Sequence, residues 1–139
     1  MSQTVIPYLT VHGAAEAIDF YKKAFGATEN THMPEPDGKR LLHADLTING
    51  GSLYLSDEFR EFSEQGGPAA PKQGSASPVA VTLALNAPAD VDRTFEQAVS
   101  AGAKSGGDPQ DMFWGARFAV LIDPFGHRWM LSAPLPGQK

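Results

Sequence analysis

The sequence predicts an α+β fold made of two tandem strand–helix–strand–strand–strand units in a single domain spanning residues 1–139. Two segments with helical spacing of apolar residues are each bracketed by alternating, strand-like runs. A stretch rich in Gly, Pro, Ala and Ser separates them and has no periodicity. We place the repeat units at about residues 4–59 and 78–133, joined by a flexible loop at about 60–77.

The first unit begins with a strand and a helix. The short apolar run "VIPYLTV" predicts the strand, and "GAAEAIDFYKKAFGA" predicts the helix that follows. Within this segment, Ile18, Tyr21 and Phe25 recur at helical spacing, and Gly26 supplies a C-terminal stop.

A hairpin follows the first helix. The stretch "RLLHADLTI" alternates, then "NGG" turns the chain into "SLYLSD". We assign Leu42, Ala44, Leu46 and Ile48 to the helix side of the strand. His43, Asp45 and Thr47 would then face the other side.

The second unit repeats this order. "VAVTLAL" predicts a strand, "ADVDRTFEQAVSAGA" a helix, and "ARFAVLI" with "HRWMLS" a hairpin closed by "DPFG". The repeat period is about 70 residues, and the two helices and two hairpins align in the same order. The chain is therefore predicted to be a tandem repeat.

Composition excludes several partners and compartments. The formal net charge is −5 and Lys and Arg do not cluster, so we expect no nucleic-acid partner. No apolar run is long enough to span a membrane, and the N-terminal residues do not form a leader, so no membrane association is expected. The absence of cysteine fits a reducing compartment and indicates a cytoplasmic protein.

The repeated units resemble the vicinal oxygen chelate superfamily, which includes glyoxalase I, bleomycin-resistance proteins and extradiol dioxygenases. The resemblance is carried by "IDFYKKAFGA" and "DPFGHRW", and extends from Val5 to about Ser132. The segments "LHADLTING", "LYLSDE" and "MFWGARF" are similar to its PhnB-like branch. The resemblance implies an open, curved, eight-stranded barrel-like sheet with helices on the convex side, a ligand site on the concave face, and a homodimer.

The resemblance also marks where a metal would bind. Metal-using members place four ligands, usually His and Glu, on the first and last strand of each unit. In this sequence, the resemblance places the four ligand positions at Ile6, Tyr54, Thr82 (or its neighbour Val81) and Met130. None is a His or a carboxylate, so we expect no metal site. No glycine-rich turn suited to a nucleotide-like cofactor is present, and no cofactor is expected.

His43 is the best candidate for a catalytic residue, because the unperturbed pKa of histidine is near neutrality. The alternative is a histidine that only hydrogen-bonds a neighbour. Tyr54 offers a hydroxyl to the cleft or packs as a ring. On the last strand, Arg128 and Met130 should face the cleft, whereas the residues that alternate with them should pack toward the helices.

The segment "DPQDMFWGARF" is a candidate pocket wall. Phe113 and Trp114 could stack on a planar ligand, and Arg117 could bind an anionic group. The alternative is a core anchor beside a surface arginine. The ligand-binding set that we predict is His43, Tyr54, Trp114, Arg117, Arg128 and Met130.

The remaining polar residues have simpler interpretations. Asp57 and Glu58 end a strand and are predicted to be solvated turn residues. His32 and Met33 lie beside "PEPDG", a predicted loop tip. His12 precedes the first helix, where capping or exposure is expected.

Three function classes follow. The first, which leads, is a metal-independent small-molecule-binding protein with its ligand in the concave cleft of a homodimer. The second is a glyoxalase-like lyase or isomerase that uses His43 and Tyr54. The third is a metal-dependent enzyme of the superfamily whose metal ligands lie at other positions than Ile6, Tyr54, Thr82 and Met130.

Overall fold

The computed structural model describes residues 3, 5–34, 40–59, 61, 69–71 and 77–137. The first unit contains, in order, β1 (Tyr8–Val11), α1 (Ala14–Phe25), β2 (Thr28–Pro34), β3 (Leu41–Ile48) and β4 (Gly51–Asp57). The second contains β5 (Ala80–Ala84), α3 (Pro88–Ala101), β6 (Lys104–Met112), β7 (Ala116–Ile122) and β8 (Arg128–Pro134). The predicted order of elements is confirmed.

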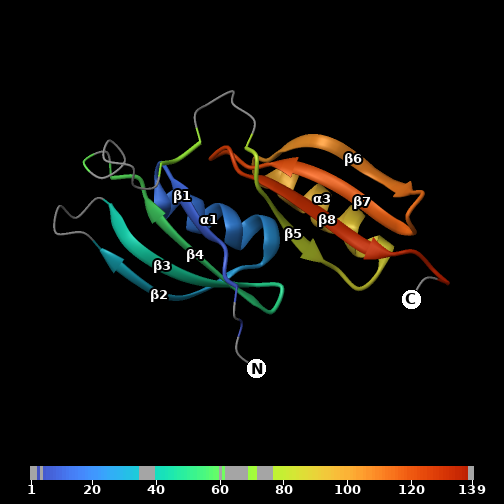
Figure 1. The fold of residues 1–139 in the computed structure, drawn as a ribbon, viewed down its shortest axis with the longest axis horizontal. Coiled ribbons are helices and arrows are strands. Elements are labelled where there is room, and N and C mark those ends of the chain that lie inside the picture. Colours follow the sequence, from blue (N-terminus) through green and yellow to red (C-terminus); the bar gives the residue numbers. More distant parts are fainter. Residues whose placement is uncertain are drawn as a thin grey trace.

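The eight strands form two four-stranded sheets with identical topology. Their orders are β1-β4-β3-β2 and β5-β8-β7-β6. In each sheet the first strand pairs with the last strand in parallel, and the other pairs are antiparallel. The sheets lie side by side, with β1 and β5 at their adjoining edges (Figure 1). The α+β class of two βαβββ units is therefore confirmed.

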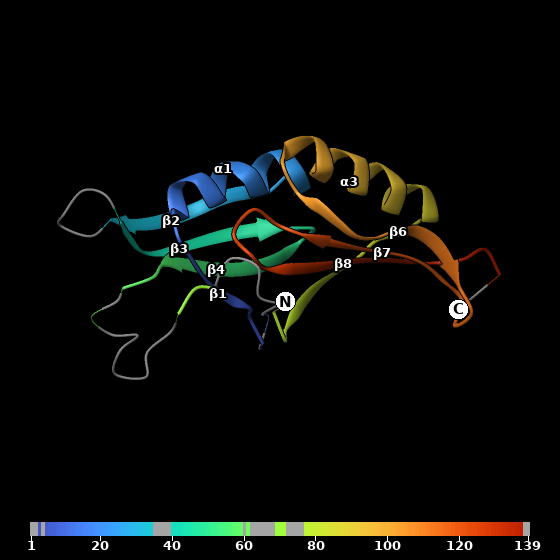
Figure 2. The ribbon, with the colours of Figure 1, turned by 90° about the horizontal axis from the view of Figure 1, so that it is seen from above.

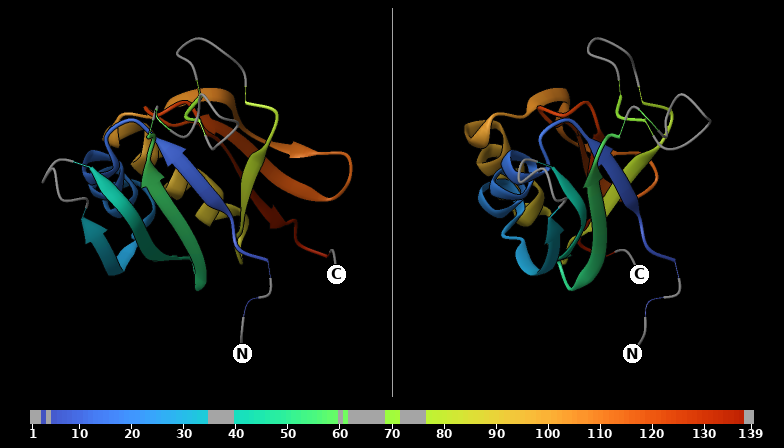
Figure 3. Two further views of the ribbon diagram at one scale, coloured as in Figure 1. Left: turned by 60° about the vertical axis from the view of Figure 1, so that its left-hand side comes forward. Right: turned by 90° about the vertical axis from the view of Figure 1, so that its left-hand side faces the viewer.

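Both helices lie on the same side of the two sheets. Figure 2 shows α1 and α3 along one side, with the strands below them. Figure 1 looks onto the opposite side, which neither helix covers. We call this side the open face. Figure 3 shows the curvature of the two sheets from the side.

Alternation in the strands decides which side chains reach the open face. In β3, Ala44, Leu46 and Ile48 are buried under α1, whereas His43 and Asp45 are only partly buried. Leu42 departs from this prediction and is 43% exposed. It lies at the start of the strand, next to an irregular register between β2 and β3.

The second sheet follows the same rule. Trp129, Leu131 and Ala133 are buried on the helix side of β8, and Arg128 and Met130 alternate with them. His127, which directly precedes β8, contacts the first unit. Its Nε2 lies 2.8 Å from the carbonyl oxygen of Thr10 in β1 and links the two units.

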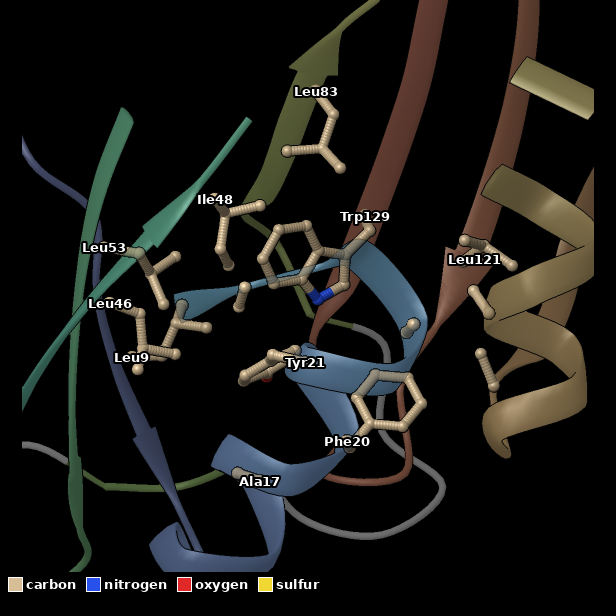
Figure 4. Packing of buried hydrophobic residues seen from close by; sticks show 14 of the residues in the cluster. Leu9, Ala17, Phe20, Tyr21, Leu46, Ile48, Leu53, Leu83, Leu121 and Trp129 are labelled. Atoms are coloured by element: carbon tan, nitrogen blue, oxygen red, sulfur yellow. The ribbon is translucent and has the colours of Figure 1, made fainter. Parts of the chain in front are cut away.

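A buried carboxylate joins the two units at the centre of the core. Asp123 Oδ2 accepts hydrogen bonds from the Tyr21 hydroxyl (2.5 Å) and from Trp129 Nε1 (2.9 Å). Asp123 Oδ1 accepts from the backbone N–H groups of Phe125 and His127. Figure 4 shows Tyr21 and Trp129 in contact within the core. Burial, with a smaller contribution from Asp123, raises the pKa of Tyr21 well above its ordinary value.

A second buried carboxylate anchors α1, contrary to the prediction that Asp57 is a solvated turn residue. Asp57 Oδ1 accepts from the backbone N–H groups of Gly13 and Ala14, and Oδ2 accepts from Leu41 N–H. Glu58 is also engaged, because its Oε1 accepts from Ala70 N–H at 2.6 Å. These carboxylates satisfy backbone donors that the fold would otherwise leave without partners.

Further hydrogen bonds cross between the units. Asn49 Nδ2 donates to the Ala84 carbonyl, and Gln97 Nε2 donates to the Lys23 carbonyl. With the Tyr21 and His127 contacts, they connect the units through sheets and helices. The predicted loop at 60–77 lies mostly outside the described residues.

Two smaller predictions concern the first sheet and the surface. His32 and Met33 belong to β2 and not to a loop tip; the neighbouring residues 35–39 lie outside the described residues. The His12 side chain is 64% exposed and lies 3.4 Å from Glu58 Oε1. No helix in the described ranges is long and apolar enough to cross a membrane.

Candidate functional site

The first half of the open face is built around two tyrosines. Strand β1 begins at Tyr8, so Ile6 lies before the strand and does not occupy the predicted position. The parallel register places Tyr8 opposite Tyr54. The alternation in "YLTV" predicts that Tyr8 lies on the open face, because Leu9 and Val11 are buried on the other side of the strand.

His43 joins these tyrosines in an aromatic cluster. The Tyr8 hydroxyl lies 3.1 Å from His43 Nδ1, within hydrogen-bond distance. The His43 and Tyr54 rings meet edge to face with centroids 4.8 Å apart, and Tyr8 and Tyr54 are 6.0 Å apart. Tyr8 is half exposed. The cluster therefore offers aromatic surface, one imidazole and two hydroxyls to an approaching molecule.

The second half of the open face is more apolar. The register of β5 and β8 places Thr82 opposite Met130, which is the counterpart of the Tyr8 and Tyr54 pair. Trp114, in the turn between β6 and β7, is 52% exposed and meets the Phe118 ring edge to face at 5.5 Å. Arg128 supplies the positive charge at the beginning of β8.

Arg117 does not reach the open face. Its Nε lies 3.1 Å and 3.2 Å from the two carboxylate oxygens of Asp92 on α3, and Nη1 lies 2.9 Å from Asp111. The hydrogen bonds that Arg117 donates to Asp92, and then the bond to Asp111, raise the pKa of Arg117 above its ordinary value. The residue is thus a charge-paired link between β7 and α3, and the predicted anion-binding role is not supported by its position.

Trp114 and His43 also lie apart. His43 is on β3 of the first sheet, and Trp114 is in the β6–β7 turn of the second sheet. Figure 1 places the β6–β7 turn and β3 at opposite ends of the molecule. One chain therefore presents two separate half-sites on its open face: Tyr8, His43 and Tyr54, and Thr82, Trp114, Phe118, Arg128 and Met130. The register of β7 and β8 places Trp114 and Arg128 at opposite ends of the second half-site.

The two residue pairs that face each other across β1 and β4 and across β5 and β8 do not form a metal-binding donor set. Tyr8, Tyr54, Thr82 and Met130 offer phenol, alcohol and thioether groups, whereas Zn²⁺ and related ions require imidazole, carboxylate or thiolate ligands. Over the described ranges, no group of three or more His, Asp or Glu side chains is placed to hold a metal ion. The fold family's metal does not fit these residues.

Comparison with known proteins extends these observations. The family model described as the Glyoxalase/Bleomycin resistance protein/Dioxygenase superfamily matches residues 3–131. An uncharacterized protein of Mycobacterium bovis is 43% identical over 129 residues, covering 93% of this chain and 82% of that protein. An uncharacterized protein of Mycobacterium tuberculosis has the same identity, with 93% and 73% covered.

Solved structures show the same fold. A glyoxalase/bleomycin resistance protein/dioxygenase from Nocardioides is 27% identical with a TM-score of 0.73, covering 100% of this chain and 87% of that one. TioX from Micromonospora sp. ML1 is 25% identical with a TM-score of 0.71, covering 96% and 100%. A PhnB protein from Bacillus cereus, at 17% identity and a TM-score of 0.71 over 94% and 99%, shares the fold.

Proposed function

The chain belongs to the glyoxalase/bleomycin resistance protein/dioxygenase superfamily, and on that premise we propose that it binds a small organic molecule without a metal, in a cleft shared by two copies of the chain. One observation carries the proposal: the paired positions on the open face hold Tyr8 with Tyr54 and Thr82 with Met130. These side chains suit contact with an organic ligand better than coordination of an ion.

The shared cleft follows from the arrangement of the half-sites. Both half-sites lie on the open face of one chain, and among the described residues neither half-site forms an opposing wall for the other. A second copy, related by a two-fold axis, would lay its second sheet over the first sheet of its partner. Tyr8 and Trp114, both half exposed, would then be covered, which accounts for large apolar side chains on this face.

The chemistry of the half-sites indicates a planar or partly aromatic ligand. The rings of Tyr8, Tyr54 and Trp114 provide stacking surfaces. Arg128 can pair with an anionic group because it is the cation beside Met130 on the same side of β8. Met130 supplies an adaptable apolar contact.

A thermal-unfolding screen combined with metal analysis tests this function. The purified protein should contain no stoichiometric transition metal, and chelator should leave its melting temperature unchanged. A planar aromatic carboxylate at 100 times its Kd should add about 2.7 kcal/mol of stability. One tightly bound metal per chain, or stabilisation only when a divalent metal is added, would contradict the proposal.

A lyase or isomerase is the second candidate, and the hydrogen bond between Tyr8 and His43 favours it. When the Tyr8 hydroxyl donates to Nδ1, the neutral ring carries its proton on Nε2, and this N–H can donate a hydrogen bond to an oxygen on which negative charge develops in a bound molecule. NMR of the ligand found in the screen separates the candidates. Recovery of unchanged ligand supports binding alone, whereas conversion by the wild type but not by His43→Ala supports catalysis.

A further inference from the structure

A cavity of about 230 Å³ lies at the junction of the two sheets. Its walls come from both units: the β3–β4 turn and the chain before β1 on one side, and β5 with Trp129 on the other. The lining includes Asn49, Ser52, Val81, Thr82, Leu83 and Ala84. His43, Trp114 and Arg128 do not line it, so the cavity is separate from most of the open-face site.

The floor of the cavity is apolar and rigid. Ile48, Leu83 and Trp129 are buried and converge at the junction, as Figure 4 shows. Asn49 Nδ2 donates to the Ala84 carbonyl at 2.9 Å and holds the two walls together. Gln3 closes a third side, because its side chain pairs with both the N–H and the carbonyl of Ser52.

The lining carries no ionisable side chain. It contains Gln, Asn, Ser and Thr among apolar residues, and no Asp, Glu, His, Lys or Arg. Ser52 and Thr82 bring hydroxyl groups to the lining, where they can hydrogen-bond a ligand. A charged ligand would lose its hydration here without gaining a counter-charge.

We propose that this junction cavity is a second binding site, for a neutral compound of about the size of one or two fused rings with one hydrogen-bonding group. A dry apolar cavity of about 150 Å³ is sufficient for benzene. The extra room and the two hydroxyls accommodate a polar substituent on such a ring. The proposal does not rest on the proposed function, because Thr82 is the only one of these lining residues that also belongs to an open-face half-site.

The fluorescence of Trp129 tests this site directly. The chain has two tryptophans, so Trp114→Phe leaves Trp129 at the cavity floor as the sole indole reporter. In this background, benzamide, benzyl alcohol and naphthamide are titrated to millimolar concentration. We expect at least one of them to change the Trp129 emission in a saturable way, and benzoate, the anionic counterpart of benzamide, to leave it unchanged.

A matched pair of variants locates the binding. Ala84→Leu places a larger side chain at the cavity, whereas Ala80→Leu makes the same change on the same side of β5, outside the lining. Ala84→Leu should raise the Kd about tenfold or more, and Ala80→Leu should change it by less than about twofold. If Ala84→Leu unfolds, NMR of the protein with Ala84 intact locates the binding instead. We then expect intermolecular NOEs from the bound ring to the methyl groups of Val81 and Leu83.

Three results would overturn the proposal. The first is the absence of saturable binding by every neutral probe. The second is equal binding of benzoate and benzamide, since the lining offers no cation. The third is an equal loss of affinity in folded Ala84→Leu and Ala80→Leu, or NOEs only to residues outside the cavity.

Discussion

At the residue scale, the buried carboxylate of Asp123 accepts four hydrogen bonds. Its oxygens accept from two side chains and two backbone N–H groups, and they connect α1 to the start of β8. A buried carboxylate is stable only when its acceptors are satisfied in this way. Tyr21 contributes one of these donors from the other unit, so its protonation state bears on the stability of the whole core.

The first prediction concerns Tyr21 and alkaline pH. Because the pKa of Tyr21 is raised in the folded protein, its stabilising contribution is fully present below the unfolded pKa of about 10. That contribution is lost as pH rises from about 10 toward the folded pKa. The free energy of unfolding of the wild type should therefore fall more steeply above pH 10 than that of Tyr21→Phe. Urea titrations between pH 8 and 11 measure this, and parallel pH profiles would contradict it.

The second prediction concerns Trp114 and the open-face ligand. If its half-exposed ring is a stacking anchor, Trp114→Ala should weaken the ligand found in the screen by about 1–3 kcal/mol. Trp114→Phe keeps an aromatic face and should retain most of the affinity. Calorimetric titration of both folded variants is the measurement. Equal affinities in Trp114→Ala and wild type would return Trp114 to a purely structural contact with Phe118.

At the element scale, α1 is attached to the sheet at its first turn and is ended by a glycine cap. Its first turn is held by Asp57 at the end of β4, and its last turn ends at Gly26, which has φ +70°. Asp57 also binds Leu41 N–H and so fixes where β3 begins. One side chain therefore sets the relation of a helix to two strands.

The third prediction follows from this attachment. Asp57→Ala leaves three backbone N–H groups without their acceptor and should cost about 2–4 kcal/mol of folding free energy. Asp57→Asn keeps one acceptor oxygen for α1 and should cost less. Asp90→Ala, which removes an exposed bond to Ala87 N–H at the start of α3, is the control and should cost about 1 kcal/mol. A loss in Asp57→Ala no larger than in Asp90→Ala would contradict this account.

Local patterns predicted the elements well and the roles of single residues less well. The alternation of β3 and β8 correctly assigned His43, Arg128 and Met130 to the face opposite the helices. In β7, apolar residues occupy both faces, so alternation gave no side for Arg117; its partner Asp92 lies on α3. Asp57 was misjudged because its partners at Gly13 and Leu41 are distant in sequence and not visible in a local pattern.

At the scale of the whole molecule, the two units are joined and neither helix covers the open face. Hydrogen bonds cross the junction from Tyr21, Asn49, Gln97 and His127. The two half-sites remain separate on this body, because the sheets lie side by side and face the same way. Their separation is the reason that we propose a second copy as part of the binding cleft.

The fourth prediction is the size of the assembly. Light scattering at micromolar concentration should give twice the 14.8 kDa mass of one chain. Because the shared cleft places Tyr8 of one copy against the second sheet of the other, Tyr8→Arg should shift the equilibrium toward the monomer. Val99→Arg, at an exposed apolar residue on α3 away from the open face, is the control and should leave the dimer intact. A wild-type monomer at this concentration would contradict the shared cleft.

The two buried carboxylates make one half of the chain depend on the other in only one of the two cases. Asp57 binds only groups of its own half, whereas Asp123 in the second half takes the Tyr21 hydroxyl of the first. A chimera made of two first halves would keep the topology but lack Asp123, and one made of two second halves would bury that carboxylate without Tyr21. One half of the chain therefore cannot replace the other. A symmetric version of this protein would first require a redesigned junction between the two units.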